Sequence, residues 1–186
     1  MKKRGIRIKK AALASLFAAL GVVIAPWLWF PVLGSKAYPG QHLMNAIAGI
    51  LIGPWWAALA ALATGLVRIA LGVGTIYAMP GGIPGAVVVG LCYELFRRIG
   101  DRMEALGIPK EIAALLEPVG TVFVGGTIAL YLVAPAIGDA RTMGRPLLIL
   151  WSGWALSSVP GSILGFLILL GLRRAGITRE SLFGER

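Results

Sequence analysis

The sequence predicts an all-α membrane protein, a bundle of six transmembrane helices with both termini in the cytoplasm. Of its 186 residues, 58% are hydrophobic and only 14% are charged, whereas about a quarter of the residues in soluble domains are charged. The charged residues are also gathered in short segments between long apolar stretches, so they cannot form the polar shell of a water-soluble core. These observations exclude a soluble enzyme.

Five apolar stretches supply the candidate spans, because a helix needs about 20 residues to cross the bilayer. They cover residues 11–33, 42–72, 84–96, 112–138 and 147–172. The second stretch is long enough for one tilted helix or for two short helices interrupted at Gly53-Pro54, where proline has no backbone N–H to donate. The chain therefore has either five spans or six.

The placement of Lys and Arg decides between these alternatives, since cytoplasmic loops retain basic residues. With six spans, one side holds 14 basic residues and the other holds three, namely Lys36, Arg141 and Arg145. With five spans the two sides hold 8 and 9, which gives no preferred orientation. We therefore expect six spans in a multi-pass protein of the cell membrane. The expected division is a basic cytoplasmic N-terminus at 1–10, a six-span transmembrane domain at 11–174 and a cytoplasmic tail at 175–186, with loops 31–41, 73–83 and 137–146 outside.

A cleaved signal peptide is the alternative reading of the first span, because basic residues precede an apolar run and Ser35-Lys36-Ala37 has small residues suited to cleavage. The run is about 20 residues long, and it carries Trp27 and Trp29 at its far end. Tryptophan is favoured at membrane interfaces, so we expect a retained span.

Cofactor, metal and nucleic-acid binding are not expected. The single cysteine, Cys92, and the single histidine, His42, are too few for a disulfide framework or for a protein-only zinc site with three or four ligands. The net charge is +10, and most of the basic residues flank the apolar stretches. No basic stripe with interleaved aromatic residues remains for binding nucleic acid.

One face of the first span is small and the opposite face is bulky. At 100° per residue, the small face consists of Ala11, Ala14, Ser15, Ala18, Val22 and Ala25. Because membrane helices associate by close packing over small residues, this face predicts a helix contact, either with a partner protein or within the chain itself.

Two later spans carry polar or aromatic stripes, which inside a bilayer face protein or water. The fifth span presents Glu117, Gly120, Thr121, Val124, Ile128 and Tyr131, and the sixth presents Trp151, Trp154, Ser158 and Ser162. Glu117 is thus a functional candidate, or else a structural partner for a buried cation such as Arg68. Arg68 also lies close enough to the outer end of its span to extend toward the interface. Glu94 is expected to form a local ion pair with Arg98, four residues later.

The predicted binding site lies in the outer half of the bundle, under the loops 31–41 and 73–83. His42 and Asn45 open the second span on one face, although a lone histidine at a helix start is often only a cap or an interface residue. A site for a small ligand needs apolar or aromatic faces and a few convergent hydrogen-bonding groups. The candidate residues are Lys36, Gln41, His42, Asn45, Tyr77, Glu117, Trp151, Trp154 and Ser158.

The chain resembles the substrate-binding S components of energy-coupling factor vitamin transporters, and among them the ThiW family, which is associated with the thiazole moiety of thiamine. The resemblance is carried by the small-residue first span 11–25, by the stretch 36–42 with Asn45, by 48–54, Arg68, 72–75 and 80–82, and by Glu117 with Gly120-Thr121. It implies a six-helix subunit that captures a vitamin precursor such as hydroxyethylthiazole from outside and joins a transmembrane T subunit and two cytoplasmic ATPases. It also implies docking on the T subunit through Ala11, Ala14, Ser15 and Ala18.

The sequence agrees with this resemblance in one respect, since it has no Gly-x-x-x-x-Gly-Lys-Ser/Thr motif for ATP. Three alternatives stay open: an S component for another vitamin, a membrane scaffold that only recruits other proteins, and a membrane-embedded enzyme that uses Glu117, Glu94 or His42. The enzyme is the least favoured, because the residues suggest no paired carboxylates or nucleophile and base at one level of the bilayer.

Overall fold

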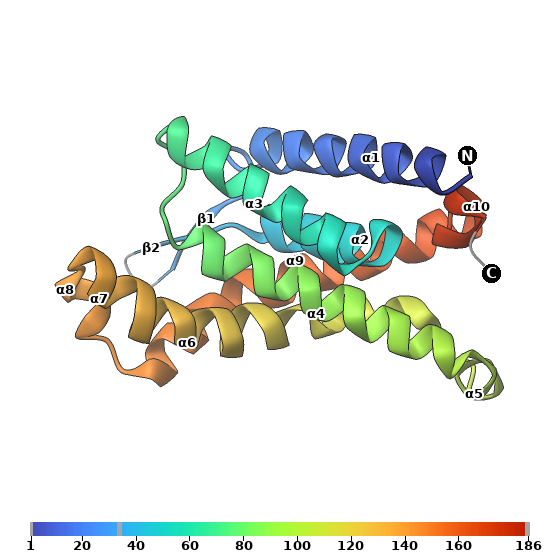
Figure 1. Cartoon of the computed structure of the whole chain (residues 1–186). Coiled ribbons are helices and arrows are strands. Elements are labelled where there is room, and N and C mark those ends of the chain that lie inside the picture. The colour runs from blue at the N-terminus through green and yellow to red at the C-terminus, as the bar shows by residue number, and fades with distance from the viewer. Residues whose placement is uncertain (1, 33–34, 185–186) are drawn as a thin grey trace.

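The computed structural model describes residues 2–32 and 35–184 as a bundle of long helices (Figure 1). The long helices are α1 (Lys2–Ile24), α2 (Pro39–Ile52), α3 (Pro54–Ala70), α4 (Ala78–Arg98), the segment Lys110–Ile137 and α9 (Leu147–Arg174). Short helices α5 (Gly100–Ala105), α8 (Ala140–Met143) and α10 (Arg179–Phe183) lie between or after them. The prediction of an all-α membrane protein is confirmed in this coarse form, and among the described residues α4, Lys110–Ile137 and α9 are long and apolar enough to cross a membrane.

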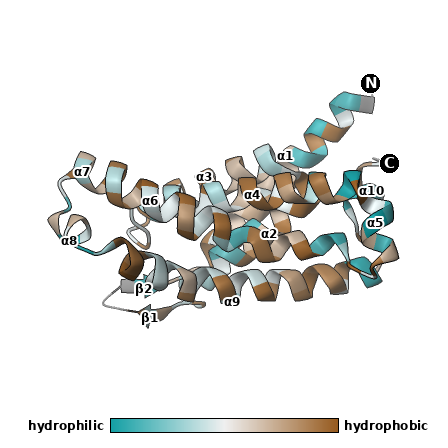
Figure 2. Cartoon of the chain, turned by 90° about the horizontal axis from the view of Figure 1, so that it is seen from below, coloured by the Kyte–Doolittle hydropathy of each residue, from teal (hydrophilic) through white to brown (hydrophobic). Residues whose placement is uncertain are grey.

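Both described ends of the chain lie at one end of the bundle, next to α5 and α10, and the loops around α8 lie at the opposite end (Figure 1). Hydrophilic residues are concentrated in the first turns of α1 and around α5 and α10, whereas much of the length of the bundle is apolar (Figure 2). We call the two ends the terminal end and the loop end. This arrangement places the segments with many basic residues together.

The predicted interruption at Gly53-Pro54 is confirmed. α2 ends at Ile52, Gly53 has a φ of +88°, and Pro54 begins α3. Proline is favourable at this position because the first N–H groups of a helix have no intrahelical acceptor. Gly90 of α4 crosses at this point, because a Cβ there would lie 2.5 Å from the backbone of Pro54. The two short helices therefore leave the break in different directions and both pack on α4.

The expected extent of the first span is wrong at its outer end. α1 ends at Ile24, and the chain then turns into β1 (Phe30–Val32), which pairs in antiparallel register with β2 (Ser35–Ala37). Proline at position 26 disfavours helical backbone at Ala25 and donates no hydrogen bond. The segment expected as an irregular loop is therefore partly a hairpin. We call β1 and β2 the hairpin.

The fourth helix starts at Ala78, six residues earlier than the apolar stretch suggested, and contains prolines at 80 and 84. Pro84 has no N–H for the carbonyl of Pro80. A Cβ on Gly125 would lie 1.9 Å from the oxygen of that carbonyl, and one on Gly120 would lie 2.3 Å from the carbonyl oxygen of Pro84. These two glycines thus let the fifth helical segment contact the exposed backbone of α4 directly.

The fifth segment is not a regular α-helix, and its predicted face is wrong beyond Thr121. It consists of the 3₁₀ helix η1 (Lys110–Leu116), the π-helix η2 (Val119–Gly125), α6 (Gly126–Ile128), the π-helix η3 (Ala129–Val133) and α7 (Ala134–Ile137). Val124 and Tyr131 are exposed, whereas Gly125, Ala129 and Ala134 are buried. A π-type turn contains more residues than an α-helical turn. The buried face of this segment therefore differs from the one predicted with 100° per residue.

α2 lies at the centre of the bundle, and all but one of its residues are buried. α9 packs against it at Gly161 and Gly165, where a Cβ would lie 2.4 Å from the carbonyl oxygen of Pro39 and 2.7 Å from Cβ of Ala46. Small residues allow such close helix contact in membranes. This contact brings Ser158 of α9 to the level of the first turn of α2.

At the terminal end, Glu94 pairs with Arg97 at 3.6 Å and with Arg179 of α10 at 2.6 Å. The expected pair with Arg98 is wrong. A capping box between Thr178 and Ser181 begins α10 and thereby fixes Arg179 beside Glu94.

Candidate functional site

A cavity of about 690 Å³ opens at the loop end of the bundle. Its walls come from the hairpin, the first turn of α2, the 72–78 segment between α3 and α4, the region of α8 and the outer part of α9. Its volume lies within the range of small-molecule sites in proteins, about 300–1,000 Å³. The cavity therefore has room for a ring with substituents.

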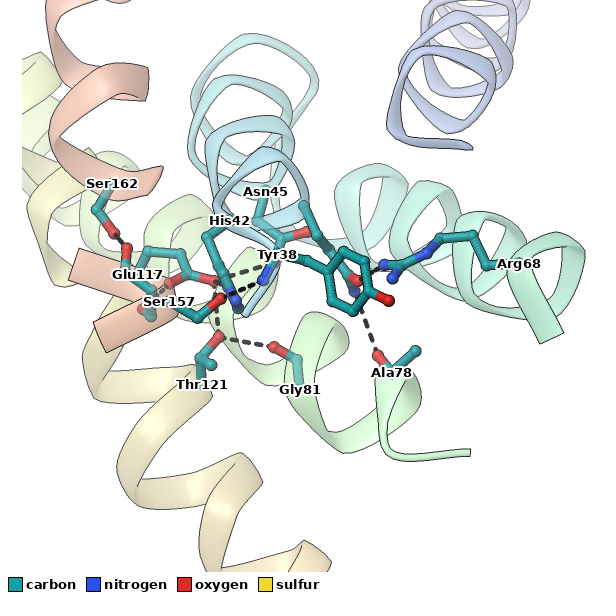
Figure 3. A network of polar contacts seen from close by, with 12 residues as sticks. Tyr38, His42, Asn45, Arg68, Ala78, Gly81, Glu117, Thr121, Ser157 and Ser162 are labelled. Carbon is teal, nitrogen blue, oxygen red and sulfur yellow. Dashed lines mark hydrogen bonds and ion pairs between the residues drawn. The ribbon is translucent and has the colours of Figure 1, made fainter. Parts of the chain in front are cut away.

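Arg68, Tyr38 and Gln41 form one wall of this cavity (Figure 3). Arg68 is only 2% exposed, so the expectation that it extends toward the membrane interface is wrong. Its Nη1 donates to Oε1 of Gln41, and its guanidinium lies 4.2 Å from the ring centroid of Tyr38. Gln41 in turn donates from Nε2 to the carbonyl of Ala78 at 3.3 Å. The turn of the chain before α4 therefore helps to hold the guanidinium in place.

Glu117 is the centre of a second, deeper group of contacts (Figure 3). Its carboxyl is fully buried and accepts hydrogen bonds from Asn45 Nδ2 at 3.0 Å, from Thr121 Oγ1 at 2.6 Å and from Ser158 Oγ. His42 Nδ1 lies 3.0 Å from the same oxygen that Asn45 and Thr121 contact. We call these five residues the Glu117 network. Glu117 thus has neighbours of its own, and the suggested pairing with Arg68 is replaced by the contact between Arg68 and Gln41.

His42 connects the network to the cavity, because it belongs to the first and lines the second. Since a carboxylate oxygen only accepts hydrogen bonds, its contact with Glu117 places a proton on Nδ1. The contact with Glu117 therefore leaves Nε2 as the ring nitrogen that is available to a ligand.

Tyr77 and Asp139 meet on the side of the cavity nearest α8. The Tyr77 hydroxyl donates to Asp139 at 2.5 Å, and Thr142 donates to the same side chain from Oγ1 at 2.7 Å and from its backbone N at 3.2 Å. These hydrogen bonds, that of Tyr77 first, hold the pKa of the Asp139 carboxyl down at about 2. Partial burial, and then the hydrogen bond to Asp139, raise the pKa of the Tyr77 phenol. The Asp139 carboxyl therefore stays ionised and the Tyr77 phenol stays protonated throughout the physiological pH range.

Aromatic side chains complete the cavity. Trp29 at the end of the hairpin and Trp154 of α9 both line it, and Lys36 lies 4.4 Å above the Trp29 ring. Trp151 instead packs edge-to-face on Phe123 with ring centroids 5.0 Å apart and is not part of the lining. Two tryptophans thus offer ring faces or edges to a ligand.

The structure divides the nine predicted site residues into three groups. Those that line the cavity are Lys36, Gln41, His42, Tyr77 and Trp154. Asn45, Glu117 and Ser158 lie in the Glu117 network behind His42, and Trp151 lies outside both groups. Sequence reasoning did not assign Tyr38, Arg68, Asp139, Arg141 or Arg145 to the site, although the scarcity of charges in the outer loops could have drawn attention to the last three.

The small face of α1 is directed partly into the bundle. Ala14 and Ala25 are buried, Ala11 and Ala18 are half-buried, and Ser15 is exposed. Thr64 of α3 donates to the carbonyl of Ala18 at 3.4 Å and would contact a Cβ on Gly21. Part of this face is therefore a contact with α3 in the same chain, and Ser15 marks its accessible edge.

These features define a helical membrane protein with a cavity for a small molecule at one end of its bundle. Residues 11–175 match the ThiW family, described as thiamine-precursor transporter protein. Because the match covers most of the chain, this protein belongs to that family of transporters. No curated protein and no solved structure matches the chain.

Proposed function

We propose that this chain is the substrate-capture subunit of an ATP-driven energy-coupling factor importer, and that its cavity binds hydroxyethylthiazole from outside the cell. The cavity at the loop end carries this proposal, because it combines the size and the chemistry of a small-molecule site with membership of a thiamine-precursor transporter family. In this arrangement the six long helices cross the cell membrane, and the terminal end faces the cytoplasm.

The cavity suits a flat heterocycle with a hydroxyl group. Trp154 supplies an aromatic surface, and an aromatic contact adds about 0.5–1.5 kcal/mol beyond burial of area. His42 Nε2 is placed to form a hydrogen bond with the ligand hydroxyl, a contact that contributes about 1 kcal/mol. A cavity of this kind favours ligand capture over the alternative of a membrane scaffold, which needs no internal site. An S component for another vitamin is the second candidate, since the volume also admits a larger ring system.

Calorimetry on the purified full chain in detergent tests this proposal. Hydroxyethylthiazole should bind, and Trp154→Ala should weaken binding by about tenfold, because about 1.4 kcal/mol corresponds to that factor. Trp151→Ala is the matched control, since this tryptophan lies on the same helix outside the cavity lining. An unchanged affinity in Trp154→Ala, or an equal loss in both variants, would remove the cavity as the binding site.

Transport by such a subunit depends on partners. The energy would come from two cytoplasmic ATPases through a transmembrane T subunit, on which α1 docks with the edge formed by Ala11, Ser15 and Ala18, next to the buried Ala14. Replacing the exposed Ser15 with Leu should block close helix approach and so reduce transport by the assembled complex, while binding of hydroxyethylthiazole by the isolated subunit persists. Loss of binding in Ser15→Leu, or full transport, would contradict docking at this edge.

A further inference from the structure

The positive charges at the loop end all surround the cavity. The chain has 18 Lys and Arg residues, and only four lie in or next to the segments at this end. All four line the cavity: Lys36, Arg68, Arg141 and Arg145. They come from the hairpin, from α3 and from the region of α8, so segments far apart in the sequence bring their cations to one place.

The residues that line the cavity include fewer acidic than basic side chains. Asp139 is the one carboxylate among the lining residues, and three hydrogen bonds from Tyr77 and Thr142 already satisfy it. The carboxyl of Glu117 lies behind His42 and accepts from its own network. The lining thus carries four cations against one carboxylate.

Arg68 is the strongest indication of what this charge is for. It is 2% exposed, and within the part of the chain that the structure describes it pairs with no carboxylate. Its buried Nε has no hydrogen-bond partner among the described residues. Burial of a guanidinium without an opposite charge is unfavourable, yet Gln41 and Tyr38 hold this one in the cavity wall (Figure 3).

We propose that this cavity binds a thiazole ligand that carries an oxyanion more tightly than the neutral alcohol, and that Arg68 with Lys36, Arg141 and Arg145 receives the oxyanion. This inference rests on the proposed function, and it specifies the substrate class as a small heteroaromatic ring with a phosphate monoester or carboxylate substituent. A guanidinium presents a planar fork of donors that matches the oxygens of either group. The ring of the ligand lies toward Trp154 and His42, and the anionic substituent lies toward Arg68.

The size of the cavity and the positions of its cations suit an anionic ligand. The cavity of about 690 Å³ leaves space beyond a thiazole ring for a charged substituent and its remaining water. Lys36 belongs to the hairpin, so an anion bound between Lys36 and Arg68 would connect the hairpin to α3 and thereby hold the cavity entrance together. The same cations would also attract an anionic ligand from solution.

Binding measurements with three ligands test this proposal on the full chain in detergent micelles. The ligands are hydroxyethylthiazole, its phosphate monoester, and the carboxylate formed when the terminal carbon of the hydroxyethyl group is oxidised. We expect the monoester to bind at least tenfold more tightly than the neutral alcohol, with the carboxylate between them. We also expect added salt to weaken the two anions and to leave the alcohol unchanged. If the carboxylate binds most tightly, the oxyanion is confirmed and its source is a carboxylic acid.

Substitutions test which basic residue produces the preference for the anionic ligand. Arg68→Gln should abolish the preference for the monoester over the alcohol, while Arg98→Gln, which removes the same charge from an exposed position at the terminal end, should retain it. Lys36→Gln replaces an exposed side chain of the hairpin and should reduce the preference several-fold even if Arg68→Gln does not fold.

The outcomes separate this inference from the proposed function. If the alcohol binds as tightly as the monoester or more tightly, the oxyanion is refuted while the proposed function stands. If no thiazole ligand binds, the proposed function fails and the inference fails with it. If Arg68→Gln weakens the alcohol and the monoester equally, Arg68 has a structural role only and the proposal is overturned.

Discussion

Replacing Glu117 with Gln tests whether the Glu117 network stabilises the bundle. The substitution preserves the shape of the side chain but replaces one acceptor oxygen with an NH₂ group that can only donate. In the native protein, His42, Asn45 and Thr121 direct their donors at Oε1, and Ser158 directs its hydroxyl at Oε2. Every contact of the network is therefore weakened or reversed by this single change.

The expected loss follows from the number of contacts. A hydrogen bond to a charged group contributes about 1.5–3 kcal/mol, against about 0.5–1.5 kcal/mol for a neutral pair. If Gln keeps its oxygen toward the three donors at Oε1, each of these contacts loses about 1 kcal/mol, roughly 3 kcal/mol in total. For a chain of this length that corresponds to a fall in Tm of roughly 6–12 °C.

Thermal unfolding in detergent, followed by circular dichroism, measures this effect. Ser162→Ala is the matched control, because Ser162 is equally buried on α9 but donates only to the carbonyl of Ser158 in its own helix. We expect the control to lower Tm by no more than a few degrees, about 1 kcal/mol for one neutral hydrogen bond. A Glu117→Gln protein that melts within 2–3 °C of the wild type, roughly 1 kcal/mol, would show that the network is not the stabilising element inferred from its geometry.

Two further predictions concern packing and topology. Gly125→Ala should destabilise the bundle strongly, because its Cβ would lie 1.9 Å from the carbonyl oxygen of Pro80, whereas Gly171→Ala, with no atom within 4 Å, should leave Tm unchanged or slightly raised; similar Tm values for the two variants would refute the close contact between α4 and the fifth segment. In a Cys92→Ala background, a membrane-impermeant thiol reagent should label Met143→Cys on whole cells and Leu106→Cys only after lysis, both positions being exposed, and the reverse pattern would invert the proposed orientation.

The sequence predicts the all-α membrane character of the chain and the helix break at Gly53-Pro54, because apolar composition and proline chemistry are local properties. The interruption between Ile52 and Pro54 follows from proline at a helix start and from a count of basic residues. The hairpin was not predicted, since its three-residue strands are too short to give a periodic pattern.

Side-chain directions were harder to predict than helix positions. A rotation of 100° per residue placed Glu117 and Thr121 on the inner face of the fifth segment but failed for Val124 and Tyr131, because π-type turns have a different rotation per residue. Arg68 illustrates the same limit. A cation near a helix end normally extends to water, and only the positions of Gln41 and Tyr38 in space turn it into the cavity wall.

The charge count that predicts topology also bears on the site. In the six-span topology, 14 basic residues lie on the cytoplasmic side and three lie in the outer loops. Basic residues in outer loops oppose this orientation, so the three have no role in setting it. In this protein Lys36, Arg141 and Arg145 lie in three-dimensional proximity around one cavity, together with Arg68. The four cations come from separate segments of the chain and line the same cavity. The proposed oxyanion on the ligand would explain why cations stand at this end of the chain, because each of them would then contribute to ligand binding.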